Sequence, residues 1–510
     1  MRFARGRMRR IVVLLVALTG SAMLAGWVPG RAAGGPTGPR GTPVAEHPNI
    51  VFILADDLST NLLPYMPHVL ALQRRGMTFS NYTVTDSLCC PSRASIFTGN
   101  YPHDTRIVTN ALPRGGFDLF HQLGEERRTF ATALQAAGYR TALMGKYLNS
   151  YDPDATVDGQ SPYIPPGWSQ WDVSGDHAYR GVDYPLTDNQ SVRWFGRGGR
   201  NYLTSVLDRR AQDFVDSAAH DATPFLLEVA PYSPHSPYAA APQDRGSFPG
   251  LQVPRTPAFN RLPTHPPAWL SGRPPLSPDQ IATIDADFRK RADAVQSIDR
   301  MVGDLVRTLR SDGQADNTIF VFSSDNGYHM GEYRLLPGKL AAFDTDVRVP
   351  LVVAGPGIPA GVTNPAVASG VDLAPTFDAI GGAAIPRPTD GRSMLPLFYG
   401  QQPARWPTLA LIEHRGPVVQ ANDPDLPQRG SGNPLTYAAM RSATFLYVEY
   451  THGGVEYYDL RTDPFELHNI AYSLGARRLA RLHRELAALA NCHDAAECQR
   501  ADYVRGLTYR

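Results

Sequence analysis

Short runs with strand character alternate with helical segments along most of this chain, and this alternation limits the folds open to it. Elements that alternate in this way are expected to form a mainly parallel sheet with helices on both faces. We therefore predict an α/β fold with a mainly parallel, mixed sheet between helices. The expected strands are 49–55, 140–144, 224–230, 318–323 and 350–354, and the expected helices are 130–137, 202–219, 278–310 and 372–380.

The chain has 510 residues, which is enough for a large domain and a smaller one. We assign residues 49–400 to a large α/β domain and 401–510 to a smaller α+β domain with an antiparallel sheet. Residues 231–278 are dense in proline and aromatic side chains and lack periodicity, which indicates a long ordered loop. In the smaller domain, strands are expected at 444–450 and 455–460 and a helix at 476–490.

The first 33 residues have the pattern of a signal peptide, because a basic start is followed by an apolar stretch and by small residues at 31–34. An apolar stretch of about 18 residues is at the short end of what spans a bilayer, so a retained anchor is the second interpretation. We predict a signal peptide at 1–33 and a flexible Gly-, Pro- and Thr-rich lead-in at 34–48. The protein is then secreted, periplasmic or at the cell surface, with no stable membrane insertion after signal removal.

The charge composition argues against nucleic acid as a partner. The net charge is +1, without the strong basic excess that binding to a phosphate backbone requires. Of the 49 basic residues, only Lys146, Lys290 and Lys339 are lysines. A lysine in so arginine-rich a chain indicates a place that needs a compact point charge.

Two expected strands end in pairs of side chains that carry oxygen ligands. Asp56 and Asp57 follow the first strand, and Asp325 and Asn326 follow the strand at 318–323. Ligands of open α/β sheets bind beyond the carboxyl ends of the strands, so these side chains are expected to meet there. Four such oxygens suit Ca²⁺ and, less well, Mg²⁺. Taken singly, each pair is also typical of turns and helix caps.

Three cationic side chains follow strands at the same expected edge, namely Lys146, His235 and Lys339. A divalent cation combined with lysines and a histidine is suited to hold a multiply charged oxyanion and to stabilise charge on a leaving oxygen. For each lysine alone, a solvated surface position is the alternative. The scarcity of lysine in this chain favours the functional role.

The segment 87–99, SLCCPSRASIFTG, is the most specific pattern in the chain. Pro91 is expected to open a short helix that Gly99 closes, which puts Cys89 just ahead of a helix N-terminus, where backbone N–H groups favour anions. On these grounds alone Cys89 is a candidate reactive thiolate. Near the chain end, Cys492 and Cys498 lie close enough in sequence for a small-loop disulfide.

The pattern Cys-x-Pro-Ser-Arg-Ala-x-x-x-Thr-Gly resembles the signature of the formylglycine-dependent type I sulfatases, and the resemblance extends from about Pro48 to the chain end. It implies an alkaline-phosphatase-like large domain, which makes 49–400 the catalytic domain, and one Ca²⁺ per chain. It also implies that a formylglycine-generating enzyme, as a transient partner, converts Cys89 to formylglycine (3-oxoalanine). The hydrate of this aldehyde attacks the sulfur of a sulfate ester and then eliminates sulfate. Cys90 fills the variable position as a small buried residue.

The same resemblance gives roles to single residues. His329 follows the second acidic strand end and is expected either to reach the leaving-group side or only to pack. The resemblance implies that the calcium ligands are Asp56, Asp57, Asp325, Asn326 and an oxygen of the modified Cys89, that Arg93 stabilises the formylglycine hydrate, and that Lys146, His235 and Lys339 bind the sulfate and assist the leaving oxygen.

Within the family, the chain is most similar to N-acetylglucosamine-6-sulfatases and heparan 6-O-endosulfatases. The implied substrate is a sulfated sugar such as N-acetylglucosamine-6-sulfate, or an aryl sulfate. Many arylsulfatases have Gly-Lys-x-His where this chain has Leu148, so Asn149 or His103 is expected to supply the missing polar contact. The pocket-forming segments 150–200 and 414–436 match no single specificity, and kinship fixes a reaction more firmly than a substrate.

Two other functions stay open on the sequence. One is hydrolysis of phosphate or phosphonate esters by a related enzyme of the alkaline-phosphatase-like superfamily. Sulfate carries less charge than a phosphate monoester, and we find ligands for one metal, which favours sulfate. The other is a non-catalytic relative that binds sulfated glycans, although neither the nucleophile nor a metal ligand is missing from the motifs.

Overall fold

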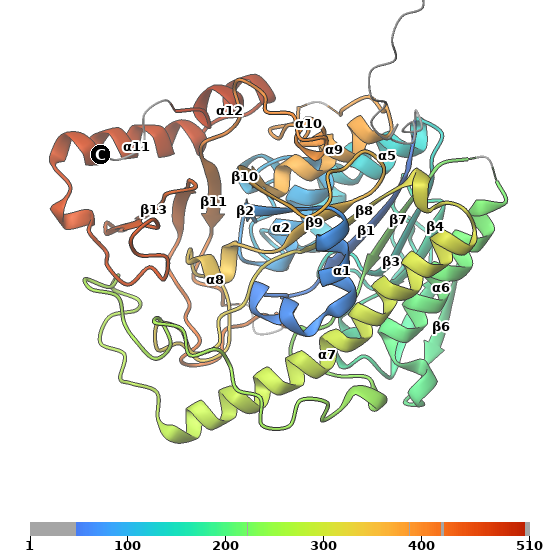
Figure 1. The fold of residues 1–510 in the computed structure, drawn as a ribbon, viewed down its shortest axis with the longest axis horizontal. Helices are drawn as coiled ribbons and strands as arrows, with labels where there is room; N and C mark the ends of the chain where they lie inside the picture. The colour runs from blue at the N-terminus through green and yellow to red at the C-terminus, as the bar shows by residue number, and fades with distance from the viewer. Residues whose placement is uncertain (1–46, 222, 387, 420–422, 505–510) are drawn as a thin grey trace, which may run out of the picture. The chain divides into compact units, whose positions relative to one another are not determined.

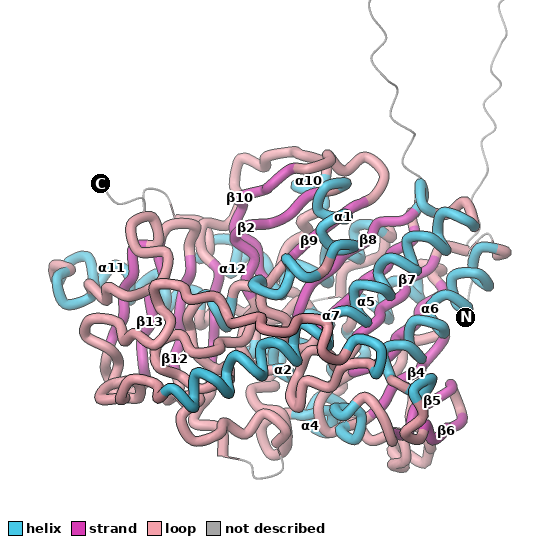
Figure 2. The backbone as a smooth tube through the Cα atoms, turned by 60° about the horizontal axis from the view of Figure 1, so that its bottom comes forward, coloured by secondary structure: helices cyan, strands magenta, loops and turns pink. Residues whose placement is uncertain are grey.

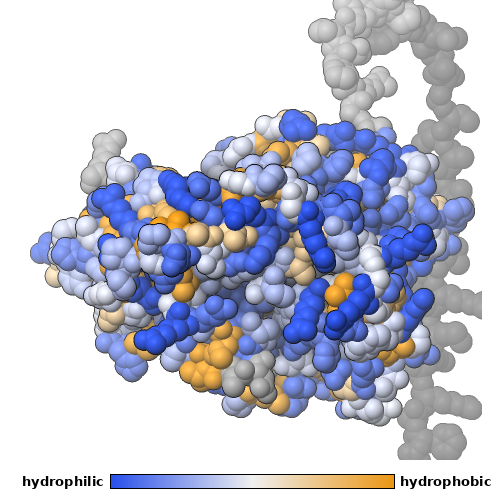
Figure 3. Space-filling model, turned by 90° about the horizontal axis from the view of Figure 1, so that it is seen from below, coloured by the Kyte–Doolittle hydropathy of each residue, from blue (hydrophilic) through white to orange (hydrophobic). Residues whose placement is uncertain are grey.

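The computed structural model describes residues 47–504, except 222, 387 and 420–422. The expected signal peptide and nearly all of the lead-in lie outside the described residues. None of the helices within them is both long and apolar enough to cross a bilayer. The face in Figure 3 is mainly hydrophilic, with hydrophobic side chains in small separate patches. Because the expected signal peptide lies outside the described residues, export of the chain stays a prediction.

A central eight-stranded sheet dominates the described region (Figure 1). In the order in which they lie side by side, its strands are β10 (Val362–Ser369), β2 (Met77–Thr83), β9 (Leu351–Ala354), β8 (Thr318–Ser324), β1 (Asn49–Ala55), β7 (Phe225–Ala230), β3 (Arg140–Lys146) and β4 (Gln170–Ser174). Strand β9 runs antiparallel to both neighbours, and all other pairs in the sheet are parallel. The predicted mainly parallel, mixed sheet is confirmed.

The central strand β1 shows why the sheet is covered on both faces. Its sequence NIVFILA is apolar at every position after the first, as is typical of strands buried on two sides. Ile50, Phe52 and Leu54 pack into the hydrophobic core on one face of the sheet. Val51 and Ile53 pack into the core on the other face.

Helices cover both faces. On one face lie α1 (Pro67–Arg75), α6 (Leu203–Ala219) and α7 (Pro278–Ser311), and Figure 1 shows α7 crossing the sheet beside α6. On the other face lie α2 (Cys89–Thr98), α5 (Phe130–Ala136) and α9 (Leu373–Ile380). The expected helices are confirmed with shifts of one residue at their ends. Shorter helices are α3 (Pro102–Thr105), α4 (Gly116–Gln122), α8 (Asp344–Val347) and α10 (Leu395–Phe398).

The long helix α7 fixes the proline-rich loop that precedes it. Ser277 caps the helix, because its hydroxyl accepts a hydrogen bond from Gln280 N while the Gln280 side chain accepts one from Ser277 N. Asp285 of α7 accepts a hydrogen bond from Val253 N, and Asp293 accepts one from Gly246 N. The loop at 231–278 is therefore tied to α7, and its one regular element is a short 3₁₀ helix, Pro242–Asp244.

A separate antiparallel sheet follows toward the C-terminus. Its strands are β11 (Ala410–His414), β12 (Tyr437–Arg441), β13 (Phe445–Tyr450) and β14 (Val455–Asp459), in that order. Helix α11 (Ala476–Leu489) packs into the core of this sheet, and a disulfide between Cys492 and Cys498 joins its end to α12 (Ala495–Ala501). The antiparallel sheet and the disulfide are confirmed, and a domain boundary at 401 stays a prediction.

The two remaining strands of the described region, β5 (Tyr184–Asp188) and β6 (Ser191–Phe195), form a small antiparallel hairpin. Figure 2 shows this hairpin near β4, whereas β12 and β13 stand at the opposite end of the described region. The two peripheral sheets thus flank the central one at its two ends.

Candidate active site

Four oxygen-bearing side chains meet beyond the carboxyl ends of β1 and β8, which are parallel neighbours. Asp57 N donates a hydrogen bond to Asp325 Oδ1 at 3.1 Å, and Asn326 Nδ2 donates to Asp57 Oδ1 at 2.6 Å. Asp56 lies in the same buried cluster. Asp57 has a φ of 62°, a left-handed conformation that turns the chain so that two successive carboxylates contact one cluster.

Cys89 is the first residue of α2 and points into this cluster. Its Sγ lies 3.2 Å from Asp56 Oδ1 and 3.5 Å from Asn326 Oδ1. One turn later, Arg93 Nε donates to Asp325 Oδ2 at 2.8 Å, so helix α2 is held against the end of β8. Gly99 ends the helix with a φ of 73°, as expected from the sequence.

Two of the three lysines of the chain reach the same cluster. Lys146 Nζ donates to Asp56 Oδ2 at 2.8 Å. Lys339 Nζ donates to Asp57 Oδ1 at 2.7 Å and lies 2.9 Å from Cys89 Sγ. The glycine before Lys146 is required, because its φ is 112° and a Cβ there would lie 2.1 Å from a backbone oxygen of β7.

His235 follows β7 and completes the set that sequence analysis selected. Its Nδ1 donates to the carbonyl oxygen of Ser236 at 2.7 Å, and its Nε2 lies 3.6 Å from Asp57 Oδ2. Burial alone would lower the pKa of His235, but neighbouring carboxylates, with Asp57 first, raise it to about 9. These carboxylates therefore favour the protonated imidazole.

The surroundings shift the pKa values of Asp325 and Cys89 in opposite directions. Although burial opposes ionisation of Asp325, Arg93, Lys146 and Lys339 hold the pKa of its carboxyl below the ordinary value. Burial, Asp325 and other carboxylates raise the pKa of the Cys89 thiol well above its ordinary value. The thiolate expected from the helix N-terminus alone is therefore not favoured. The pKa of the neighbouring Cys90 is raised by burial to about 12, in keeping with a packing role.

The cluster fits a hard cation. Asp57 Oδ2 is buried and has no hydrogen-bond partner among the described residues. An oxygen of this kind is costly to bury unless a cation or donor binds it. The candidate ligand atoms of Asp56, Asp57, Cys89 and His235 lie within 4.8 Å of one another. Because most donors here are carboxylate and amide oxygens, Ca²⁺ suits the site better than a transition metal.

Asp425 belongs to the cluster although the sequence patterns did not indicate it. This buried carboxylate lies 2.8 Å from Lys339 Nζ and accepts a hydrogen bond from His235 Nε2 at 2.7 Å. Asn110 Nδ2 donates to its second oxygen at 2.7 Å. Despite burial, Lys339 and His235 hold the pKa of Asp425 well below its ordinary value. The Asp-Pro-Asp run at 423–425 was the available signal, but away from a strand end it is typical of any turn.

His329 lies outside the cluster. Its Nδ1 is 2.9 Å from Asp346 Oδ1, and its Nε2 donates to the carbonyl oxygen of Ser431 at 2.8 Å. Both ring nitrogens are thus engaged, which favours the packing interpretation over a substrate contact.

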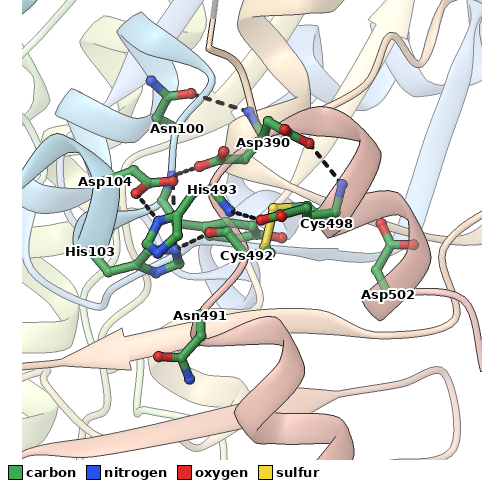
Figure 4. The surroundings of a disulfide bond; sticks show 12 residues. Asn100, His103, Asp104, Asp390, Asn491, Cys492, His493, Cys498 and Asp502 are labelled. Carbon is green, nitrogen blue, oxygen red and sulfur yellow. Dashed lines mark hydrogen bonds and ion pairs between the residues drawn. A yellow bond between two sulfur atoms is a disulfide. The ribbon is translucent and has the colours of Figure 1, made fainter.

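The two candidates for the missing polar contact differ in position. Asn149 Nδ2 donates to the hydroxyl of Tyr179, whose ring lies 4.5 Å from that of His235 and 5.2 Å from Lys146 Nζ. His103 instead lies beside the C-terminal disulfide (Figure 4). Asn149 therefore supports the wall of the cluster, and His103 does not reach it.

One hollow opens at the cluster, and a second lies beside it. A small one, of about 60 Å³, is lined by Asp57, His235, Lys339 and Asp425. A larger one, of about 850 Å³, begins on the other side of the His235 loop and is lined by Tyr179 and by side chains of the β5–β6 region. The larger hollow includes the half-exposed ring of Trp194 together with Arg180, Arg197 and His177.

The predicted alkaline-phosphatase-like fold is confirmed by solved structures. The solved structure of a protein in complex with its substrate D-glucosamine-2-N,6-O-disulfate superposes with a TM-score of 0.71 at 22% identity, covering 89% of this chain and 98% of that one. A phosphonate monoester hydrolase from Silicibacter pomeroyi superposes with a TM-score of 0.68 at 23% identity, covering 88% and 96%. At such low identities, the two comparisons define the fold alone.

The amino-acid sequence defines the family. The family model described as Sulfatase matches residues 48–382, more than half of the chain, and the protein belongs to this family. N-acetylglucosamine-6-sulfatase from Capra hircus is 34% identical over 476 residues, covering 88% of this chain and 84% of the goat enzyme. The protein is therefore a sulfuric ester hydrolase.

Proposed function

We propose that this protein removes sulfate from sulfated glucosamine residues, using formylglycine made from Cys89 and one bound Ca²⁺. The position of Cys89 carries the proposal. Its Sγ lies 3.2 Å from Asp56 Oδ1 and 2.9 Å from Lys339 Nζ, so it stands between the oxygen ligands and a fixed cation. An aldehyde hydrate at this position would have one hydroxyl near the cation site and one near the lysine.

Conversion of Cys89 requires a partner enzyme that acts early. The side chain is completely buried and is held between α2 and the ends of β1 and β8. A modifying enzyme could not reach it in the folded chain. We infer that a formylglycine-generating enzyme meets this segment before the fold closes around it.

The described side chains supply the charges that sulfuryl transfer requires. Bound Ca²⁺, held by Asp56, Asp57, Asp325 and Asn326, would offset the negative charge of the sulfate. Lys146, His235 and Lys339 bind the sulfate oxygens, and preorganised cations of this kind stabilise charge that develops on a leaving oxygen. Arg93 binds Asp325 and lies behind the nucleophile, where it stabilises the formylglycine hydrate.

The chemistry divides into three steps. One hydroxyl of the hydrate gives its proton to a neighbouring carboxylate as it forms a bond to sulfur, and the bond from sulfur to the sugar oxygen breaks as that oxygen takes a proton. The second hydroxyl then loses its proton, the carbon–oxygen bond to the sulfate breaks, and the aldehyde re-forms. Water adds to the aldehyde to restore the hydrate. His235 would give the proton to the leaving oxygen, and its Nε2–H would then exchange its hydrogen bond to Asp425 for one to the substrate.

The larger hollow suits a sugar. Trp194 presents an apolar ring that can stack on a pyranose, and Arg180 and Arg197 can bind anionic substituents. The goat relative is named for a sulfate at position 6 of N-acetylglucosamine. We propose the same class of ester as the substrate, with aryl sulfates as small surrogates.

We propose that the protein acts outside the cytoplasm. The Cys492–Cys498 disulfide fits an oxidising compartment. Residues 1–33, which lie outside the described region, carry the expected signal peptide, and we propose that they direct export.

A combined mass and rate measurement tests the function. The protein is produced together with a formylglycine-generating enzyme, and the tryptic peptide 76–93 is expected to have the mass of formylglycine or its hydrate in place of cysteine. The modified protein should hydrolyse N-acetylglucosamine-6-sulfate faster than a matched phosphate or phosphonate ester. Faster hydrolysis of the phosphorus ester would favour a phosphate or phosphonate ester hydrolase. No hydrolysis of either ester would favour a glycan-binding role.

A further inference from the structure

We propose a second metal site, built from His103, Asp104 and His493 beside the C-terminal disulfide, that binds a transition-metal dication such as Zn²⁺ (Figure 4). The candidate ligand atoms of these three residues lie within 4.8 Å of one another. His493 Nδ1 is 2.6 Å from Asp104 Oδ1, and His103 Nε2 is 3.7 Å from Asp104 Oδ2. His103 and Asp104 belong to α3, whereas His493 lies between α11 and α12, some 390 residues later.

The orientation of His103 matches that of a metal ligand. Its Nδ1 lies 2.7 Å from Glu413 Oε2, and Glu413 is buried on β11. Metal-binding histidines usually donate their second ring N–H to a carboxylate in this way, which fixes the ring and the tautomer. The other nitrogen, Nε2, then faces the cluster, where a metal would replace its 2.8 Å hydrogen bond to the carbonyl oxygen of Cys492.

Two buried carboxylate oxygens at this cluster lack a hydrogen-bond partner among the described residues, which is independent support for a cation. Asp390 is 3% exposed and contacts the carboxyl of Asp104. Neither Asp104 Oδ2 nor Asp390 Oδ1 has a hydrogen-bond partner among the described residues. No lysine or arginine of the described chain forms an ion pair with Asp104, Asp390 or Glu413.

The donor set selects the kind of metal. Two imidazole nitrogens and a carboxylate suit Zn²⁺ and its neighbours, whereas Ca²⁺ and Mg²⁺ prefer oxygen ligands throughout. The side chain of His493 is 65% exposed, so the metal would be reached from solvent and would keep a place for water. A bound metal would fasten the segment after α11 to α3 of the central fold.

The test is a count of bound zinc in buffer that contains saturating Ca²⁺. Wild type, His493→Ala and His483→Ala are titrated with Zn²⁺ by calorimetry, and the metal that remains after desalting is measured. His483 is a matched control, because its side chain is also 65% exposed and its Nδ1 lies 2.9 Å from a carboxylate, Glu449 Oε2. We expect wild type and His483→Ala to hold one zinc more than His493→Ala.

A second variant tests the carboxylate behind His103. Glu413→Gln keeps the size of the side chain but weakens the orientation of the ring, and we expect zinc affinity to fall about 10- to 100-fold. Zinc that binds near Cys89 is common to all variants and cancels in the comparison. Zn²⁺ should also raise the melting temperature of wild type and His483→Ala, but not of His493→Ala. Equal zinc content in the two histidine variants, or no zinc in wild type, overturns the proposal.

Discussion

Among the described residues, two clusters of carboxylates and histidines could hold a metal ion, and their surroundings differ. Around Cys89, each cluster carboxylate contacts a buried cation or amide, and the residues are almost completely shielded from solvent. Around His493, the described carboxylates form ion pairs with imidazoles alone, and one imidazole faces solvent. Both clusters join segments that are far apart in sequence.

The difference indicates what each cluster can bind. Oxygen ligands for a metal next to fixed lysines can hold an anion and the charge that develops when its ester bond breaks. Carboxylates and imidazoles without lysine or arginine can bind a cation but offer little to an anionic substrate. Changes at the first cluster should therefore abolish turnover, whereas changes at the second should alter metal content and leave turnover intact.

The largest effect is expected for Cys89→Ala. Removal of the nucleophile should lower kcat for a sulfate ester by about 10⁴-fold or more, because no other side chain can form the covalent intermediate. Cys90→Ala is the matched control, since this buried neighbour is expected only to pack, and its kcat should be unchanged. Substantial turnover by Cys89→Ala, measured on protein purified in parallel with the control, would contradict the proposed mechanism.

Metal removal should separate the two clusters. Chelation is expected to reduce sulfatase activity by about 10²- to 10³-fold, because the charge of the sulfate loses its counter-ion. Ca²⁺ added back should restore the rate. Zn²⁺ added back alone should raise the melting temperature through the second cluster without restoring the rate. Restoration of full activity by Zn²⁺ alone would show that the proposed division of metals is wrong.

Lys339→Ala tests the fixed cations directly. Lys339 contacts Asp57, Asp425 and Cys89, and its loss should lower kcat/KM by roughly 10²- to 10³-fold. Lys290→Ala is the control, because Lys290 is exposed on α7 and contacts only Asp287 among the described residues. His493→Ala should behave like this control in the rate assay, although it lacks the second metal. A rate loss in His493→Ala comparable to that of Lys339→Ala would remove the contrast between the clusters.

The strand ends were predictable because two simple rules apply there. Long apolar runs mark β1 and β8, and parallel strands bring their carboxyl ends to one edge of the sheet, so Asp57 and Asp325 were expected at the same edge, where they meet. The motif around Cys89 and the spacing of Cys492 and Cys498 were equally local signals. Local sequence could not show that Cys89 is buried. Burial keeps the Cys89 thiol neutral, although Cys89 begins a helix.

Less regular parts escaped prediction for physical reasons. Strand β2 (MTFSNYT) mixes polar and apolar residues, and edge strand β10 contains Pro365 at a shift in register, so neither has the pattern of a buried strand. Asp425 reaches Lys339 from a turn rather than from a strand end. The pairing of Asp104 with His493 spans 389 residues, and no periodicity records such a contact.

A smaller effect is expected for Trp194→Ala in the hollow beside the first cluster. Loss of the exposed ring should raise KM for a sulfated glucosamine about 3- to 10-fold, which corresponds to one aromatic contact. KM for a small aryl sulfate should change little, because such a substrate ends before the ring. Tyr472→Ala removes another exposed aromatic ring, away from the hollow, and serves as the control. Equal effects on both substrates would place the sugar elsewhere.

Glu228→Gln should have the smallest effect on turnover, and it tests a buried carboxyl in neither cluster. Glu228 lies in β7 with no hydrogen-bond partner for either oxygen among the described residues, and burial raises its pKa to about 8 although Arg93 opposes the shift. The folded state therefore holds a proton that the unfolded state releases from about pH 4.5 upward, so the stability of wild type falls relative to the variant as pH rises toward about 8. Melting temperatures of the two proteins should differ by more at about pH 9 than at about pH 5. A difference that stays constant with pH would mean that Glu228 is ionised in the folded protein and has a cation of its own, like the carboxylates around Cys89.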